Sequence, residues 1–350
     1  MVHIGLISYS LYLWHWPLLV FARFWNGLQP IDHWRPLLLV LSIALTALSH
    51  RCIEVRFRRR AAGKRTKSVF VASGVASAAT LLIATHGIAH QGHPQRVSAE
   101  VLAMDLERRP ELPFRRCEGR HDGCRIGLDA ADAHMPSILF WGDSHMLAWA
   151  PALDVALKEH GLAGTLQFAP GCPPVFGVVN EKIHACTGLN DALRKQIRSG
   201  RFRAVVMSAH WSTYAKGRTP HVRMESDGES VLSDALPRSV STIRKSGVPV
   251  YLMGPLPVYP VDIPAMRTAS AMRRKALPSP QTRAEHVRNH EEFFRAARRS
   301  PTTAPFDPSE WMCRADCAVV THDGHSIYRD SHHLSLAGAM EYLPQIGHDR

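Results

Sequence analysis

The residues with the clearest capacity for chemistry are a serine after an apolar run and an acid–histidine pair near the end of the chain. Ser144 lies in the sequence GDSH at 142–145, directly after the apolar residues 137–141. A serine hydroxyl is a poor nucleophile until a base takes its proton, and the base needs an orienting group. Asp330 precedes His333 closely enough for one loop to carry both. This pattern predicts a catalytic Ser144–His333–Asp330 set; the simpler alternative is a serine that only caps a helix.

An alternation of strands and helices from residue 137 onward must position these residues. The predicted strands cover 137–141, 165–168, 204–208 and 248–253, and the predicted helices cover 145–160, 188–199, 231–246, 282–299 and 335–346. Residues 319–328 predict a hairpin around the Asp323-Gly324 pair. Such alternation gives an α/β fold with a parallel sheet and helices on both faces. Ligands bind beyond the carboxyl ends of parallel strands, which is where Ser144 falls.

Three apolar segments near the N-terminus predict about three transmembrane helices. They cover residues 4–24, 36–53 and 69–89, and a spanning helix needs ~20 mostly apolar residues. A buried core helix is the alternative for each, and residues 69–89 could also pass for a signal sequence. Residues 56–67 contain seven basic residues and no acidic residue, and loops of this kind stay in the cytoplasm. We therefore expect a multi-pass protein of the bacterial inner membrane whose C-terminal domain lies in the periplasm.

The net charge and the cysteines also indicate the compartment in which the chain lies. The formal net charge of +12 suggests nucleic acid, a membrane surface or an acidic polymer as neighbour. Because the basic run lies between two apolar segments, we expect a membrane and no nucleic acid. Six cysteines follow the last apolar segment as close neighbours, and we expect disulfides between them, with local pairing as the interpretation. These are Cys117 with Cys124, Cys172 with Cys186, and Cys313 with Cys317.

A zinc site is the alternative for the last cysteine pair. Cys313 and Cys317 lie near His322 and His325, and such side chains can bind zinc. The spacing of these histidines matches no common zinc site, and the expected compartment is oxidising. The sequence therefore predicts no metal and no bound cofactor.

Together, these motifs resemble the SGNH (GDSL-like) hydrolase superfamily. The resemblance rests on GDS at 142–144 after a first strand and on Asp330-x-x-His333 near the C-terminus. The tail GHSIYRDSHHLSLAGA at 324–339, GCPP at 171–174 and GPLP at 254–257 resemble SGNH domains fused to membrane acyltransferases. The resemblance implies an SGNH/flavodoxin-like fold, with Ser144 as nucleophile and His333, rather than the neighbouring His332, as the base oriented by Asp330.

The N-terminal sequence is similar to the end of the acyltransferase-3 membrane barrel. ISYSLYLWHWPL at 7–18 resembles its penultimate span, and SHRCIE at 49–54 resembles the end of its last span. In that family, the membrane part brings an acyl group from a cytoplasmic donor such as acetyl-CoA, and the SGNH domain delivers it to sugar hydroxyls. The family's catalytic His and Arg lie in earlier spans. We therefore expect an N-terminally truncated chain whose partner is the missing acyltransferase module.

The resemblance also divides the chain and suggests how an oxyanion is held. Residues 1–55 correspond to the last two spans, 56–68 to a cytoplasmic basic loop, 69–89 to an additional transmembrane helix, 90–136 to a periplasmic linker and 137–350 to the SGNH domain. SGNH enzymes take an oxyanion-hole Asn from a third block, but the corresponding residues 206–211 contain none. We expect backbone N–H groups of Ser144 and Gly171 to form the hole. Trp211 and Tyr214 are candidates to stack on a sugar, with core packing as the alternative.

These observations predict an O-acyltransferase, most simply an O-acetyltransferase, that acts on a cell-surface polysaccharide or glycan through an acyl-serine. Acetyl-CoA or another acyl-CoA would be the indirect donor. A periplasmic glycan acetyl-esterase using the same residues is one alternative. An inactive glycan-binding remnant of a truncated acyltransferase is another.

Overall fold

The computed structural model describes residues 2–28, 30–55, 66–107, 113–128, 137–273, 277, 281–300 and 306–343. The chain forms two compact units. The helical unit comprises Met1–Asp105 with Ala265–Leu277, and the sheet unit comprises Leu106–Pro264 with Pro278–Arg350. Most of the predicted basic loop, residues 56–65, lies outside the described residues.

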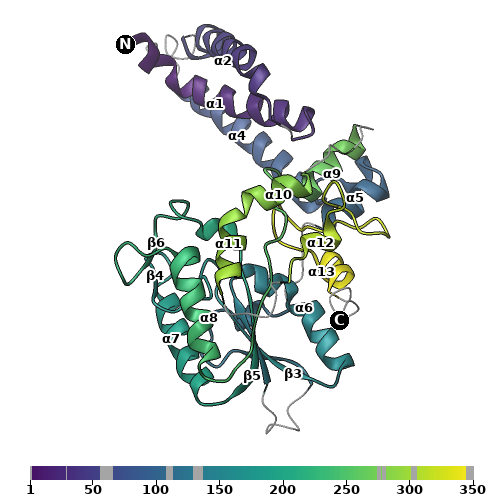
Figure 1. Cartoon of the computed structure of the whole chain (residues 1–350). Coiled ribbons are helices and arrows are strands. Elements are labelled where there is room, and N and C mark those ends of the chain that lie inside the picture. The colour runs from purple at the N-terminus through teal and green to yellow at the C-terminus, as the bar shows by residue number, and fades with distance from the viewer. Residues whose placement is uncertain are drawn as a thin grey trace. The chain divides into compact units, whose positions relative to one another are not determined.

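The helical unit contains the predicted apolar segments as helices (Figure 1). These are α1 (Val2–Trp25), α2 (Arg35–Ser49), continued by a π-helical turn at His50–Glu54, and α4 (Thr66–Ala89), followed by the short α5 (Ala99–Leu106). Among the described residues, two stretches are long and apolar enough to cross a membrane, Asp32–Glu54 and Ser68–Ala89. The first predicted span forms α1 but is not one of these two. A third spanning helix therefore stays a prediction.

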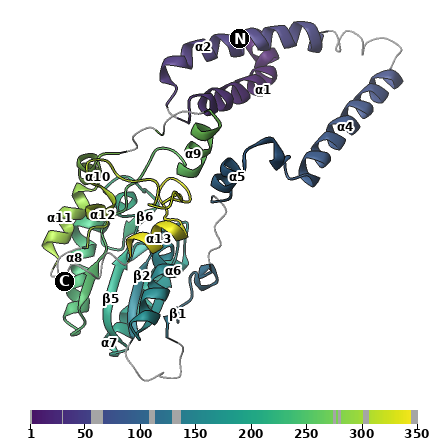
Figure 2. The same cartoon turned by 90° about the vertical axis from the view of Figure 1, so that its right-hand side faces the viewer.

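The sheet unit is built on five strands in the order β1-β3-β2-β5-β7 (Figure 2). The strands are β1 (Cys124–Gly127), β2 (Ser137–Gly142), β3 (Ala163–Phe168), β5 (Phe202–Ser208) and β7 (Val250–Leu252). β2, β3, β5 and β7 run parallel to their neighbours, whereas β1 pairs antiparallel with β3. The predicted α/β fold is confirmed, but residues 90–136, which we expected to form a linker, contribute the strand β1.

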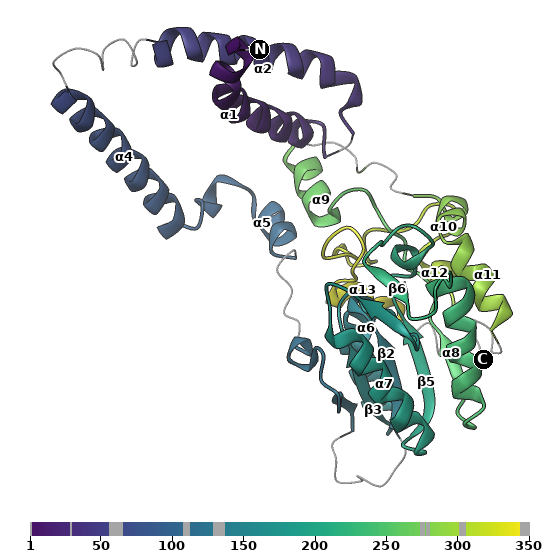
Figure 3. The same ribbon diagram turned by 90° about the vertical axis from the view of Figure 1, so that its left-hand side faces the viewer.

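Helices cover both faces of this sheet, as predicted (Figures 1 and 3). On one face, Leu139 and Trp141 of β2 share a core with residues of α7 (Ala185–Arg198), α8 (Leu236–Arg244) and α11 (Glu291–Arg299). The intervening Phe140 points to the other face, where α6 (Ser144–Glu159) lies and α13 (Leu336–Tyr342) packs on it. This alternation along β2 follows from the strand period of two.

Several elements differ from the expectation in extent. The predicted helix 231–246 begins with a π-helical turn, Val231–Ala235, before α8. The predicted helix 282–299 divides at His290 into α10 (Arg283–Asn289) and α11. The hairpin predicted at 319–328 is confirmed only as a tight reversal without strands: the chain turns at Asp323-Gly324, and Val320 and Ser326 form an antiparallel bridge.

Other short elements, besides α5 and β1, were also not predicted. They are α9 (Ile263–Met272), α12 (Ser309–Met312) and the two-stranded sheet of β4 (Val178–Asn180) and β6 (Val222–Met224).

Three disulfides confirm the local pairing of the cysteines. The bonds are Cys117–Cys124, Cys172–Cys186 and Cys313–Cys317. The first disulfide connects Cys117, which precedes β1, to the first residue of that strand. The second connects the loop after β3 to α7. Because Cys313 and Cys317 bind each other, they do not form the alternative zinc site.

Candidate active site

Ser144 lies at the tight junction between β2 and α6. Gly142 ends the strand, Asp143 caps the helix, and Ser144 is the first residue of α6. A Cβ atom on Gly142 would lie 1.9 Å from the carbonyl oxygen of Ser208, so only glycine fits beside β5. The Asp143 carboxylate accepts a hydrogen bond of 2.8 Å from the N–H of His145. The GDS sequence therefore places the Ser144 hydroxyl at the carboxyl edge of the sheet, as the sequence predicts.

The structure brings the three predicted catalytic residues together. The Oγ of Ser144 lies 2.8 Å from Nε2 of His333. Nδ1 of the same ring lies 2.7 Å from Oδ2 of Asp330. The serine and the histidine are 189 residues apart in the sequence, so the fold alone creates this contact. Distances of this kind suit proton transfer from a hydroxyl to an imidazole.

The loop that carries the acid and the base is held from several sides. Oδ1 of Asp330 accepts hydrogen bonds from the N–H groups of His332 and His333, at 2.9 and 2.8 Å. Ser335 caps α13 by accepting a hydrogen bond of 3.0 Å from the N–H of Gly338. The N–H of Ile263 donates to the carbonyl of Asp330. The loop is therefore short and fixed, as its sequence predicts.

The charge state of Asp330 follows from these contacts. Burial alone would raise the pKa of this carboxyl, but the hydrogen bonds and charge of His333 outweigh burial and hold the pKa well below its usual range. Asp330 is therefore a carboxylate at neutral pH. A carboxylate here selects the His333 tautomer that carries its proton on Nδ1, which leaves Nε2 free to accept the proton of Ser144.

Asp143 has a larger structural role than the sequence suggests. Its buried Oδ2 accepts hydrogen bonds from the N–H of His210, at 2.9 Å, and from the hydroxyl of Tyr214, at 2.8 Å. Burial raises the pKa of this carboxyl, and these hydrogen bonds act in the opposite direction. Asp143 thus connects the start of α6 to the loop after β5. This link keeps two adjacent strand ends in register around Ser144.

The backbone N–H groups expected to form an oxyanion hole are available. Ser144 is the first residue of α6, and Gly171 follows the adjacent strand β3 with a φ of 69°. Neither N–H group has a hydrogen-bond acceptor among the described residues. The carbonyl of Gly171 accepts a hydrogen bond of 2.8 Å from the side chain of Asn180, which fixes this peptide. Both donors lie at the same edge of the sheet because Gly142 and Phe168 are paired.

Trp211 and Tyr214 do not form a sugar-stacking surface. Trp211 is fully buried, stacks on Phe293 at 4.9 Å and donates from Nε1 to the carbonyl of Met253. Tyr214 is also buried, and its hydroxyl is bonded to Asp143. The sugar-stacking prediction is therefore wrong for both rings, and the alternative of core packing holds. The sequence identified the aromatic residues but not the face of the loop on which they lie.

Most of the sheet unit matches a known protein family. The family described as "SGNH domain (fused to AT3 domains)" matches residues 110–347, which is more than half of the chain. The chain belongs to this family. The sheet unit is its SGNH domain.

Two further comparisons were made. Among solved structures, the chain is similar to the periplasmic domain of the lipopolysaccharide acetyltransferase of Salmonella ser. Paratyphi A. The identity is 15% and the TM-score 0.49, with 61% of this chain and 82% of that chain covered. The search of curated proteins finds no significant match.

Three further histidines of the SGNH domain lie together beside His333, and the sequence did not reveal their grouping. The rings of His145, His210 and His332 lie 4.6 to 5.5 Å from one another. Burial, helped by the neighbouring imidazoles, lowers the pKa of His210 to about 3 and that of His332 to about 4. Burial also lowers the pKa of His145 well below its usual value. These three rings are therefore neutral at pH 7.

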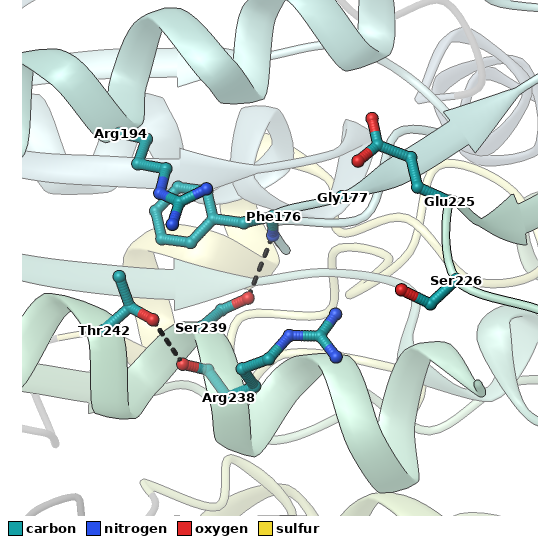
Figure 4. Close-up of a pocket in the computed structure, with 8 residues that line it drawn as sticks. All are labelled: Phe176, Gly177, Arg194, Glu225, Ser226, Arg238, Ser239 and Thr242. Carbon is teal, nitrogen blue, oxygen red and sulfur yellow. Dashed lines mark hydrogen bonds between the residues drawn. The ribbon is translucent and has the colours of Figure 1, made fainter.

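A cavity of the SGNH domain, about 300 Å³ in volume, lies apart from the predicted catalytic residues (Figure 4). Its lining consists of Phe176, Gly177, Arg194, Glu225, Ser226, Arg238, Ser239 and Thr242. The guanidinium of Arg194 lies over the ring of Phe176 at 5.6 Å, and Arg238 forms an ion pair with Glu229. None of the three catalytic candidates lines this cavity, so it is not part of their site.

Proposed function

We propose that this chain is an O-acyltransferase that uses Ser144 to pass an acyl group, most simply acetyl, to a hydroxyl of a cell-surface glycan. The observation that carries the proposal is the hydrogen-bonded series from Ser144 through His333 to Asp330, at 2.8 and 2.7 Å. Membership of the SGNH family that is fused to acyltransferase domains supports the same chemistry.

In the first half of the reaction, Ser144 becomes acylated. Nε2 of His333 takes the hydroxyl proton while Oγ attacks the acyl carbonyl. Asp330 stabilises the imidazolium that forms. The N–H groups of Ser144 and Gly171 are placed to stabilise the oxyanion, as preorganised donors do in acyl transfer. His333 then returns the proton to the leaving group.

In the second half, a sugar hydroxyl takes the place of the leaving group. His333 removes the proton of that hydroxyl, the hydroxyl oxygen attacks the acyl-serine, and Ser144 is regenerated. Residues 206–211 offer no Asn side chain to the oxyanion, and losing one such donor costs ~10²–10³ in rate. This loss slows attack by water and by a sugar hydroxyl alike, so the proposed preference for the sugar rests on a sugar held in position beside the acyl-serine.

The proposal places the SGNH domain in the bacterial periplasm. The two apolar stretches Asp32–Glu54 and Ser68–Ala89, with α1 as a third, would anchor the chain in the inner membrane. Three disulfides suit an oxidising compartment. The acyl group would come from acetyl-CoA or another acyl-CoA in the cytoplasm, through a partner acyltransferase module.

The proposal is tested with the full chain in detergent, an activated acetyl ester and oligosaccharide acceptors. We expect acetylated sugar by mass spectrometry, and none with Ser144→Ala. Acetate release that no sugar alters would identify an esterase instead. No turnover that depends on Ser144 would identify a binding remnant and overturn the proposal.

A further inference from the structure

A group of histidines next to Ser144 has a feature that acyl transfer does not use. His145 comes from the first turn of α6, while His332 and His333 come from the C-terminal loop. One ring nitrogen from each lies within 4.8 Å of the other two. Only His333 has a task in the proposed reaction, so the convergence of the other two needs a separate explanation.

Each of the three rings has a nitrogen that can serve as a ligand. Nε2 of His145 is buried and has no hydrogen-bond partner among the described residues. Nδ1 of His332 is bonded to Oγ of Ser331 at 2.9 Å, which leaves its Nε2. Nδ1 of His333 is bonded to Asp330, which leaves the Nε2 that contacts Ser144.

This arrangement has the features of a three-histidine metal site. Zn–N bonds of ~2.0–2.1 Å in tetrahedral geometry place the ligand nitrogens roughly 3.4 Å apart. Small side-chain rotations close the difference from 4.8 Å, because His332 and His333 are only half-buried. The Asp330–His333 hydrogen bond is also the contact that orients a metal-bound histidine in many zinc sites. An ion would satisfy the unpaired nitrogen of His145.

We infer that His145, His332 and His333 bind a divalent transition-metal ion of the Zn²⁺ type, and that the bound ion stops acylation of Ser144. The second part rests on the proposed function. Nε2 of His333 has one lone pair. When that lone pair binds the ion, it cannot take the proton of Ser144, and the serine loses its base.

Binding is tested without any enzyme activity. The full chain in detergent is titrated with Co²⁺, whose visible absorption bands report a site with histidine ligands. We expect these bands from the wild type and from His121→Ala, an exposed histidine outside the group. We expect their loss in His332→Ala and in His145→Ala. His332 is half-buried, so we expect the His332→Ala variant to fold. This variant therefore still tests the site if the variant of the buried His145 does not fold.

Inhibition is tested by measuring acylation of Ser144 with increasing Zn²⁺. We expect the wild type to lose activity and to regain it with EDTA. His332→Ala keeps the Ser144–His333 pair and should need at least ~10-fold more Zn²⁺, because even residues behind a metal ligand contribute roughly 10–100-fold in affinity.

The two readouts separate the claims. Co²⁺ bands that persist in His332→Ala and His145→Ala would overturn the metal site. Bands that depend on both residues, with full activity in Zn²⁺, would overturn the inhibition. A wild type without acylation activity but with histidine-dependent bands would overturn the proposed function and leave the site standing.

Discussion

The two units of this chain differ in how far their apolar side chains are exposed. In α4 of the helical unit, Leu82 and Ile83 are 69% and 74% exposed, and no described residue of Ser68–Ala89 is buried. In the SGNH domain, Leu139 and Val205 are fully buried between the sheet and its helices. The first arrangement suits the membrane environment that we propose for it, whereas the second provides its own apolar surroundings.

This difference indicates which features of the sequence each unit depends on. In the helical unit, the length and apolar composition of the helices matter more than any single residue. Many substitutions of one apolar residue by another should therefore have little effect. In the SGNH domain, the structure depends on particular residues at single positions. Gly142 fits only as glycine against β5, Asp143 joins two strand ends, and Ser144 meets a histidine from the other end of the domain. Substitutions should therefore act on different properties in the two units.

The largest expected effect is on catalysis. His333→Ala removes the base of Ser144, so acyl transfer should fall by ~10³-fold or more, since members of such a set act as a unit. The free energy of unfolding should change little by comparison. Steady-state kinetics and urea unfolding of the full chain measure both. Retained activity in this variant, with His121→Ala as control, would contradict the assigned role of His333.

The next effect is on the helical unit. Leu82→Lys places a charge in the middle of the α4 span, which costs ~2.5–3.5 kcal/mol on insertion scales. We expect the SGNH domain to remain in the cytoplasm, with its cysteines reduced and open to alkylation. Leu82→Ile is the matched control and should form all disulfides. Normal disulfides in the Lys variant would show that α4 does not control the side on which the domain lies.

A smaller effect is expected at Asp143, on stability. Asp143→Ala removes a helix cap worth ~1 kcal/mol and leaves the buried hydroxyl of Tyr214 without an acceptor, at ~1–3 kcal/mol. The free energy of unfolding should fall by roughly 2–4 kcal/mol in denaturant titrations. Asp122→Ala removes an exposed carboxylate that pairs with Arg120, and should change it by less than ~1 kcal/mol. Equal effects of the two substitutions would refute the structural role of Asp143.

The smallest effect is on pH dependence. His210 is neutral in the folded state down to a pKa of about 3, whereas the unfolded chain protonates it near its ordinary value of 6.5. Between these values the unfolded state binds the extra proton, so stability falls as the pH falls, by up to ~1.4 kcal/mol per pH unit. His210→Gln should make the slope shallower by one proton between pH 6 and 4. An unaltered slope in His210→Gln would contradict the neutral ring of His210.

Much of this arrangement follows from the sequence. The strand–turn–helix at Ser144 has an apolar strand, an obligatory glycine and a capping acid in immediate succession, and Asp330 and His333 share one loop. These local signals predicted the fold and the approach of Ser144 to His333, and the close spacing of the cysteines predicted the three disulfides.

What the sequence missed depends on packing between distant segments. β1 is too short to show a pattern of its own and becomes a strand by pairing with β3. The Asp323-Gly324 pair indicated a hairpin, but Thr321 bonds to Asp323 and to the carbonyl of His325, which closes a turn without strands. The burial of Trp211 and the approach of His145 to His332 depend on which faces of the loops turn inward.

The central claim is that Ser144 is acylated with His333 as its base, and it is tested most directly by trapping the acyl-enzyme. The full chain is mixed rapidly with an activated acetyl ester, quenched in acid and mapped by mass spectrometry. The account predicts one acetyl group on Ser144 in the wild type and none at this position in Ser144→Ala or, on the same timescale, in His333→Ala. Acetylation that spares Ser144, or that forms equally fast without His333, would contradict it.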